Sequence, residues 1–245
     1  SDAEGNKHGV LSPDEPLYGS QYLPRKFKIG IAHPTDNSVD ILTQDVGYVP
    51  VRTHGRADGA QWDLYSGGGL GMTHNNPATA PHLGLYLGRI PREQAVDAAR
   101  AIAILQRDHG ERKDRRQARW KYTIRRLGVE MVKAELRGRF GIDLRDADPE
   151  AIGPMNLHNG WHPQRDGRSY YGLSIENGRM QPPLRAAVRE AVTTLGLTVR
   201  LTAQQDLLLC DVADRAALEE IFARHRVVLP EAMSLVRRNA MAREV

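Results

Sequence analysis

The chain has 245 residues, of which 40% are hydrophobic, enough for the core of one large or two modest domains. Its 34 Lys and Arg against 30 Asp and Glu are too small an excess to indicate nucleic acid or membrane as a partner. No apolar run approaches the length of a membrane span. Residues 1–16 are polar, without the apolar stretch of a secretory signal, so we expect a cytoplasmic protein.

Cysteine and histidine usage limits metal chemistry. Cys210 is the single cysteine, which excludes an internal disulfide and any all-cysteine zinc or iron–sulfur site built by this chain alone. The nine histidines show no close pair of the kind that binds metal on a helix. We therefore predict no metal held by the protein's own side chains.

The first half of the chain is expected to form one α+β domain. Residues 1–20, rich in Gly, Pro, Asp and Ser, are predicted to be an extended arm. Strands are then predicted at 26–32, 39–42, 47–51 and 62–65, followed by a loop over 73–87. Apolar spacing predicts helices at 92–107, 114–127 and 129–139, the second opened by a capping box of Asp114 and Gln117. Polar residues 143–149 end this domain, which we place at 21–147.

The second half follows a simpler pattern. A strand at 170–175 precedes a helix that begins at Pro182 and is closed by Gly196. Strands at 198–202 and 207–212 and a helix over 214–225 complete the order strand, helix, strand, strand, helix. This order is most of a ferredoxin-like βαββαβ unit. The predicted fold class is therefore α+β, with a mixed-sheet domain, a ferredoxin-like half-domain over 148–236 and a tail over 237–245.

Two lysines share one face of a predicted strand. Alternate side chains of a strand point the same way, so Lys26 and Lys28 lie together and Phe27 lies opposite. Two adjacent ammonium groups repel each other unless something negative lies between them, which indicates an anion site. The alternative is an edge strand whose lysines deter pairing with other chains.

A glycine tract follows the next strands. Gly67, Gly68 and Gly69 allow a flat ligand to approach the backbone closely. The tract lacks the spacing and the lysine of a phosphate-binding loop. The alternative is a tight turn at the end of a strand.

The predicted helix over 114–127 is strongly basic. At about 100° per residue, Arg115, Arg119 and Arg126 fall in one arc beside an apolar stripe that begins at Trp120, while Lys121 lies on the far side. Such arginines can grip a carboxylate-rich ligand through bidentate pairs. The alternatives are a solvated basic face, or nucleic-acid binding with Trp120 as a stacking residue, against which the small net charge argues.

Taken in order, these segments resemble the sulfite and nitrite reductase family, whose members use sirohaem coupled to a [4Fe–4S] cluster. The resemblance covers nearly the whole chain from about Tyr18. The matching stretches are residues 22–28 (YLPRKFK), 67–70 (GGGL), 105–108 (LQRD), 114–123, 127–130 (LGVE) and 175–179 (IENGR).

The resemblance implies roles for individual residues. It assigns Lys26 and Lys28 to binding the substrate anion and delivering protons. It implies a cofactor-binding set in which basic side chains contact the haem carboxylates and glycine backbone lies against the macrocycle. The members of that set are Arg25, Arg115, Arg119, Lys121, Gly67, Gly68 and Gly69.

The function implied is the six-electron reduction of sulfite to sulfide, with ferredoxin or a flavoprotein as electron donor. Lys28 stands where nitrite-reducing relatives tend to have Asn, which favours sulfite over nitrite. The cysteines that bind the cluster in the family are absent here, so the resemblance implies a central fragment, inactive alone. The alternatives are a nitrite reductase of the same family and a non-catalytic module that binds a tetrapyrrole or another anion.

Overall fold

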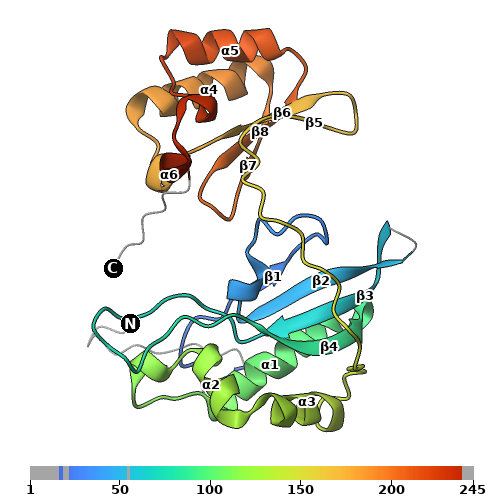
Figure 1. The fold of residues 1–245 in the computed structure, drawn as a ribbon. Coiled ribbons are helices and arrows are strands. Elements are labelled where there is room, and N and C mark those ends of the chain that lie inside the picture. Colours follow the sequence, from blue (N-terminus) through green and yellow to red (C-terminus); the bar gives the residue numbers. More distant parts are fainter. Residues whose placement is uncertain (1–16, 19–21, 54–55, 239–245) are drawn as a thin grey trace, which may run out of the picture. The chain divides into compact units, whose positions relative to one another are not determined.

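The computed structural model describes residues 17–18, 22–53 and 56–238. The chain divides into two compact units, Ser1–Pro154 and Met155–Val245 (Figure 1). The predicted mixed α+β class is confirmed. No helix in the described ranges is both long and apolar enough to span a bilayer. Most of the predicted arm over 1–20, and most of the tail over 237–245, lie outside the described residues.

The first unit is built on a four-stranded sheet in the order β1-β2-β3-β4. Its strands are β1 (Ile29–Ile31), β2 (Val46–Thr53), β3 (Arg56–Ser66) and β4 (Leu85–Pro91). β1 is parallel to β2, with Ile29 opposite Val46, and the other pairs are antiparallel. Because β1 and β2 run parallel, the chain between them must cross back, and that crossover carries the residues closest to the candidate site.

The strand predicted at 39–42 is wrong. Ile41–Thr43 forms a 3₁₀ helix, preceded by Asp40 in the left-handed region at φ 49°. The side chain of Asn37 accepts a hydrogen bond from the Ile41 amide at 2.8 Å, a local bond that competes with strand pairing.

Helices α1 (Ala95–His109), α2 (Trp120–Leu127) and α3 (Val129–Gly138) cover one face of this sheet (Figure 1). A 3₁₀ turn, Arg92–Gln94, leads into α1. The core between sheet and helices is apolar and closed to solvent, and its fully buried members include Leu64, Leu87, Ile102, Trp120, Ile124 and Leu136. The apolar stripe predicted from Trp120 is thus confirmed, since Trp120 and Ile124 are buried in that core.

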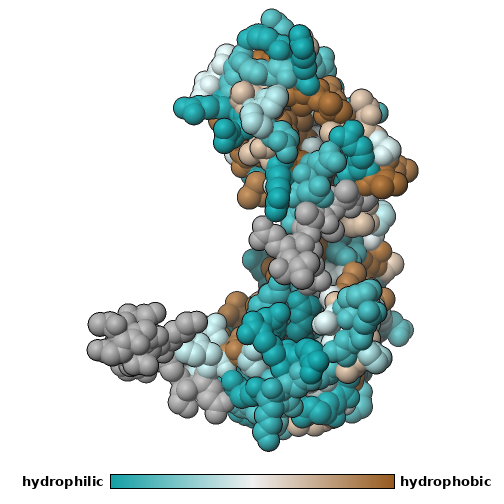
Figure 2. Space-filling model, turned by 90° about the vertical axis from the view of Figure 1, so that its left-hand side faces the viewer, coloured by the Kyte–Doolittle hydropathy of each residue, from teal (hydrophilic) through white to brown (hydrophobic). Residues whose placement is uncertain are grey.

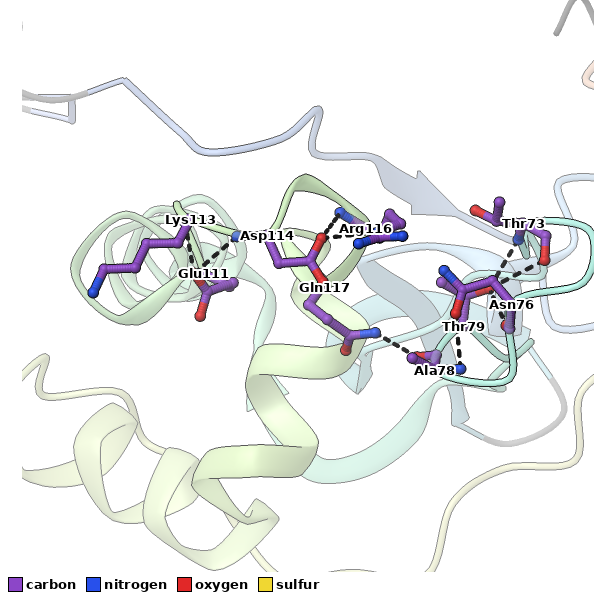
Figure 3. A network of polar contacts seen from close by, with 9 residues as sticks. All are labelled: Thr73, Asn76, Ala78, Thr79, Glu111, Lys113, Asp114, Arg116 and Gln117. Atoms are coloured by element: carbon purple, nitrogen blue, oxygen red, sulfur yellow. Dashed lines mark hydrogen bonds and ion pairs between the residues drawn. The ribbon is translucent and has the colours of Figure 1, made fainter.

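The single helix predicted over 114–127 is wrong. Arg115–Gln117 is a 3₁₀ turn, and α2 begins only at Trp120 with Arg119 as its N-cap. Figure 3 shows the reason: the Asp114 carboxylate accepts the Arg116 amide at 3.0 Å, a short-range turn, instead of capping a longer helix. Gln117 donates to the Ala78 carbonyl rather than reaching back to Asp114, so no capping box forms.

The loop predicted over 73–87 is correct only in its first part, because β4 begins at Leu85. The earlier residues form a turn closed by Thr79, whose hydroxyl accepts the Thr73 amide at 2.9 Å and donates to the Asn76 carbonyl at 2.9 Å (Figure 3). Together with the Gln117–Ala78 bond, these contacts fix the turn beside the start of α2.

The second unit contains the predicted ferredoxin-like pattern. Its sheet has the order β5-β6-β8-β7 and is antiparallel throughout, formed by β5 (Gly160–Pro163), β6 (Ser169–Leu173), β7 (Thr198–Leu201) and β8 (Leu207–Val212). Helices α4 (Pro182–Leu195) and α5 (Arg215–Arg224) pack on one face (Figure 1). Short turns Glu176–Gly178 and Pro230–Ala232 and helix α6 (Leu235–Arg238) complete it.

Strand β5 is the strand that the sequence prediction missed in this unit. It pairs with β6 at the sheet edge that the last strand of a complete βαββαβ unit would occupy. Trp161 on β5 packs edge-on against Tyr171 at 4.8 Å between ring centroids. The unit therefore has a four-stranded sheet although its sequence supplies only part of the ferredoxin-like order.

The boundary between the two units falls in the chain between Pro154 and Met155, several residues beyond the boundary expected at 147 and 148. Residues up to 154 are tied to the first unit by main-chain bonds. Gly153 donates to the Pro34 carbonyl and Asn37 donates to the Pro154 carbonyl, both at 3.0 Å.

Candidate anion-binding site

The charges of three of the predicted basic residues act on one buried carboxylate, that of Asp45. Asp45 lies between the 3₁₀ helix Ile41–Thr43 and β2 and is 4% exposed. Burial raises the pKa of its carboxyl, whereas the hydrogen bond from the Lys28 amide and the positive charges of Lys28, Arg119 and Lys26 oppose that rise. The lysine segment before β1 and the N-terminus of α2 therefore supply cations to the same place. We call Lys26, Lys28, Arg119 and Asp45 the cation cluster.

Lys28 is held at both ends. Its main-chain amide donates to Oδ2 of Asp45 at 2.8 Å, and its Nζ donates to the Thr43 carbonyl at 2.9 Å. Its carbonyl accepts the Val46 amide at 3.0 Å, which extends the parallel pairing of β1 with β2. Lys26 is exposed and Phe27 packs against the core of the first unit. The strand predicted at 26–32 is shorter than expected, because β1 covers only Ile29–Ile31 and the two lysines precede it, so a shared side for Lys26 and Lys28 stays a prediction.

The glycine tract lies against the same crossover. Gly67 donates to the Asp45 carbonyl, Gly68 to Gln44 and Gly69 to His82, at 2.8–3.0 Å. Every amide of the tract is thus used within the fold, so the tract offers no free amides to an anion. This agrees with the lack of a phosphate-loop spacing in the sequence.

Packing alone explains two of the three glycines. A Cβ on Gly68 would lie 2.1 Å from the Leu42 carbonyl oxygen, and a Cβ on Gly67, where φ is +83°, would lie 2.5 Å from Ile124. Gly69 differs, because a Cβ there would meet Arg119 at 3.5 Å and Lys121 at 3.3 Å. Of the tract, Gly69 is the residue whose Cβ position borders Arg119 of the cation cluster.

Lys121 is fully buried, with its ammonium group enclosed by carbonyl oxygens. Nζ donates to Gly71 at 2.7 Å, to Gly69 at 3.1 Å and to Ala80. The fold thus gives Lys121 a structural task, because it joins the glycine tract to the segment before β4. Contact of Lys121 with haem carboxylates stays a prediction.

Arg125, one turn after Lys121 on α2, is a second clamp that sequence reasoning missed. Its guanidinium donates to the carbonyls of Gly67, Lys121 and Leu83 at 2.9–3.0 Å. Burial, followed by the charges of Arg125 and Lys121, lowers the pKa of His82 beside the tract. The repeat of basic residues at positions 121 and 125 is the signal that could have indicated this pair.

The predicted arginine arc is broken by the turn before α2. Arg119 lies over Gly69, whereas Arg126 donates to the His109 carbonyl at the end of α1. Arg115 is exposed in its 3₁₀ turn and Arg25 is half-buried before β1. Neither is among the principal charges that act on Asp45. Their contact with a cofactor stays a prediction.

The described residues contain no group of three or more His, Cys, Asp or Glu placed to hold a metal ion. Cys210 lies on β8 of the second unit, 7% exposed, and burial raises the pKa of its thiol. Such a thiol is harder to deprotonate to the thiolate, which is the form that binds metals.

Much of the first unit's surface is hydrophilic on the side that lies at the left of Figure 1, with isolated hydrophobic residues (Figure 2). Exposed apolar side chains do flank the bridge between Gly69 and His82, namely Leu70, Met72 and Leu83. The surroundings of the cation cluster therefore combine basic groups with apolar surface, a composition suited to an anionic ligand that has a flat apolar body.

Known families match both units. The profile described as the nitrite and sulphite reductase 4Fe-4S domain matches residues 12–144, and that of the nitrite/sulfite reductase ferredoxin-like half domain matches residues 162–225. The first match covers more than half of the chain and contains the whole cation cluster.

Curated relatives and a solved structure agree with these matches. The chain is 38% identical over 234 residues to the sulfite reductase [NADPH] hemoprotein beta-component of Anoxybacillus flavithermus, covering 93% of this chain and 41% of the relative. It is 40% identical over 245 residues to the sulfite reductase [ferredoxin] of Synechococcus elongatus, covering 96% and 39%. The NirA protein of Mycobacterium tuberculosis superposes with a TM-score of 0.75 at 26% identity, covering 93% of this chain and 40% of that one. The chain thus spans about two fifths of the length of these proteins.

Proposed function

We propose that this chain, which belongs to the nitrite and sulphite reductase family, is the anion-binding part of a sirohaem-dependent reductase that converts sulfite to sulfide. The observation that carries the proposal is the cation cluster: Lys26, Lys28 and Arg119, from two separate elements, act on one buried carboxylate. A reaction on an oxyanion needs such preorganised positive charge, which stabilises the charge added during reduction.

Sirohaem fits the chemistry of these residues. Its carboxylates call for basic side chains beside backbone that a macrocycle can approach, and Arg119 lies within 3.5 Å of the Cβ position of Gly69. We infer that Arg119, with Arg25 and Arg115, holds the carboxylates, and that Gly69 marks the approach to the ring. When bound, sirohaem and its cluster supply the electrons of the reaction.

The [4Fe–4S] cluster does not fit the residues of this chain. A cluster of this type is held by Cys thiolates, and the chain has only Cys210, buried on β8. The cluster ligands must therefore be supplied by residues outside these 245. We derive no step through the cluster.

The chain's own groups would bind the anion and supply protons. Lys28, fixed through Asp45 and Thr43, presents an ammonium group at a defined position, and exposed Lys26 adds a second. As S–O bonds break, these ammonium groups donate protons to the departing oxygen. Lys28, in place of the Asn of nitrite-reducing relatives, supports sulfite. Reduction of nitrite at the same site is the alternative, and the electron donor is ferredoxin or a flavoprotein.

Substitution of Lys28 tests this proposal. In the full-length reductase, Lys28→Met should lower kcat/KM for sulfite at least about tenfold, the loss expected on removing one charge-assisted hydrogen bond. Lys113→Met removes an exposed lysine and should leave kcat/KM unchanged. Unchanged kcat/KM in Lys28→Met would contradict the assignment. Comparison of kcat/KM for sulfite and nitrite in the unsubstituted enzyme decides between the two substrates.

Assays of the isolated 245-residue chain distinguish a part of a reductase from a non-catalytic binding module. With reduced viologen as donor, we expect sulfite reduction by this chain to stay at background, because it has no cluster ligands. Sirohaem titration followed by visible absorption is the companion measurement. Tight stoichiometric binding by the chain alone, in the absence of turnover by the full-length protein, would favour the module.

A further inference from the structure

Asp45 also forms hydrogen bonds with residues that are not basic members of the cation cluster. Its carbonyl accepts the Ser66 hydroxyl at 2.8 Å and the Gly67 amide at 3.0 Å. Ser66 in turn accepts the indole N–H of Trp120 at 2.8 Å. Asp45 is therefore linked to the end of β3, to the glycine tract and, through Ser66, to the first residue of α2.

The side chain of Asp45 adds a link to the lysine segment before β1. Its Oδ2 takes the amide of Lys28, and the next residue, Val46, donates to the Lys28 carbonyl. The peptide groups on both sides of Lys28 are thus bound to two consecutive residues at the start of β2. A buried carboxylate is a costly choice for this task, because a neutral acceptor could bind the same amide. The charge itself therefore calls for an explanation.

We propose that Asp45 is the positioning residue of the anion site: its carboxylate anchors the main chain of Lys28 and is the counter-charge that an incoming oxyanion replaces. The inference rests on the proposed function, because the oxyanion is the substrate named there. The charged groups that act on Asp45 are Lys26 and Lys28 from the segment before β1 and Arg119 from the start of α2. The neighbouring ends of β2 and β3 present main-chain and hydroxyl groups.

The counter-charge makes binding of the anion depend on pH. Without an anion, three cations favour the ionised form of Asp45, while burial, the largest influence, raises its pKa. An anion that draws those cations to itself weakens their hold on Asp45, so its pKa rises further and it takes up a proton. By linkage, the anion binds more tightly as the pH falls toward the pKa of Asp45 in the complex.

Two substitutions separate the anchor from the charge. Asp45→Asn keeps an oxygen that can accept the Lys28 amide but removes the charge. Asp45→Ala removes both. Asp40→Asn is the matched control, because Asp40 lies on the same crossover and Asn tolerates its left-handed backbone at φ 49°.

Amide hydrogen exchange of the 245-residue chain tests the anchor without any cofactor. Exchange at Lys28 should accelerate at least about tenfold in Asp45→Ala, matching the loss of a hydrogen bond to a charged group. It should stay within about threefold of the unsubstituted chain in Asp45→Asn and Asp40→Asn, where an acceptor remains or is untouched. Unchanged exchange in Asp45→Ala would overturn the anchoring role.

The KM for sulfite in the full-length reductase tests the counter-charge. At neutral pH, Asp45→Asn should lower KM because a competing negative charge is gone, and Asp45→Ala should raise it because Lys28 loses its position. The ratio of KM between Asp45→Asn and the unsubstituted enzyme should approach one as the pH falls, and this ratio cancels the titration of sulfite itself. A KM that rises equally in both variants would overturn the proposal. If no form of the enzyme reduces sulfite, the proposed function fails and with it the counter-charge, while the exchange experiment still decides the anchor.

Discussion

Lys121 allows a sharp test of whether a basic residue of the site serves the fold or a cofactor. Its ammonium group is fully buried and donates to the carbonyls of Gly69, Gly71 and Ala80. Lys121→Met has a similar length and no donors. Gly69 keeps its bond from the His82 amide at 2.9 Å, but Gly71 and Ala80 lose this partner.

The expected magnitude follows from those two carbonyls. Leaving one buried polar group without a partner costs about 1–3 kcal/mol, so two cost at most about 2–6 kcal/mol, because Gly71 and Ala80 are only partly buried. Relief from burying an ammonium group offsets part of that cost. We therefore expect Lys121→Met to lower the free energy of unfolding of the first unit by about 2–4 kcal/mol.

The assay must report on the first unit alone, since two compact units can unfold separately. Trp161 is the only tryptophan of the second unit, so a Trp161→Phe background leaves fluorescence from Trp62 and Trp120. Urea unfolding of Lys121→Met is then compared with Lys113→Met, an exposed control. Equal stability of the two variants would refute the clamp and leave cofactor contact as the role of Lys121.

Three further outcomes are expected. Gly68→Ala should destabilise the first unit by more than about 2 kcal/mol in the same urea assay, because the new Cβ would lie 2.1 Å from the Leu42 carbonyl oxygen. Stability equal to that of the unsubstituted chain would contradict this packing. Burial raises the pKa of Asp206, so the second unit should lose stability as the pH rises from 3.8 through that raised pKa. Asp206→Asn should flatten this pH dependence of stability while keeping the bond from the Ile175 amide. Unchanged pH dependence in the variant would be inconsistent with this assignment. Trp120→Phe should lose at least about 1 kcal/mol in urea unfolding, through its missing bond to Ser66 and the smaller ring at a fully buried position. No loss would show that this bond does not stabilise the fold.

Long periodic segments were predictable from the sequence because their apolar spacing matches how they pack. The helices expected at 92–107, 129–139 and 182–196 correspond to α1, α3 and α4, and Gly196 ends α4 in the left-handed region at φ 66°. In these segments local preference and tertiary burial agree.

Short polar segments were not predictable, because single side-chain contacts decide them. Asn37 caps the Ile41 amide and turns a predicted strand into a 3₁₀ helix. Asp114 binds the amide two residues on and stops a helix that its spacing with Gln117 favoured. Strand β5 escaped notice because its four residues carry little pattern of their own and depend on pairing with β6.

The candidate site also has a part that the sequence predicts and a part that it does not. Lys26, Lys28 and Arg119 could be singled out from the sequence by their charge, whereas no pattern indicated that the Lys28 amide binds the side chain of Asp45. That contact joins residues 17 positions apart through a crossover whose conformation was mispredicted. The arc that linked Arg119 to Arg126 failed because it assumed one continuous helix.

The most direct test of this account is the pKa of the Asp45 carboxyl, measured by carbon-detected NMR titration of the 245-residue chain. If cations from the lysine segment and from α2 share one site, Lys28→Met and Arg119→Met should each raise that pKa, since each removes a charge that favours the ionised form. A pKa that rises in Lys28→Met but is unmoved in Arg119→Met would place the arginine elsewhere and contradict a common anion site.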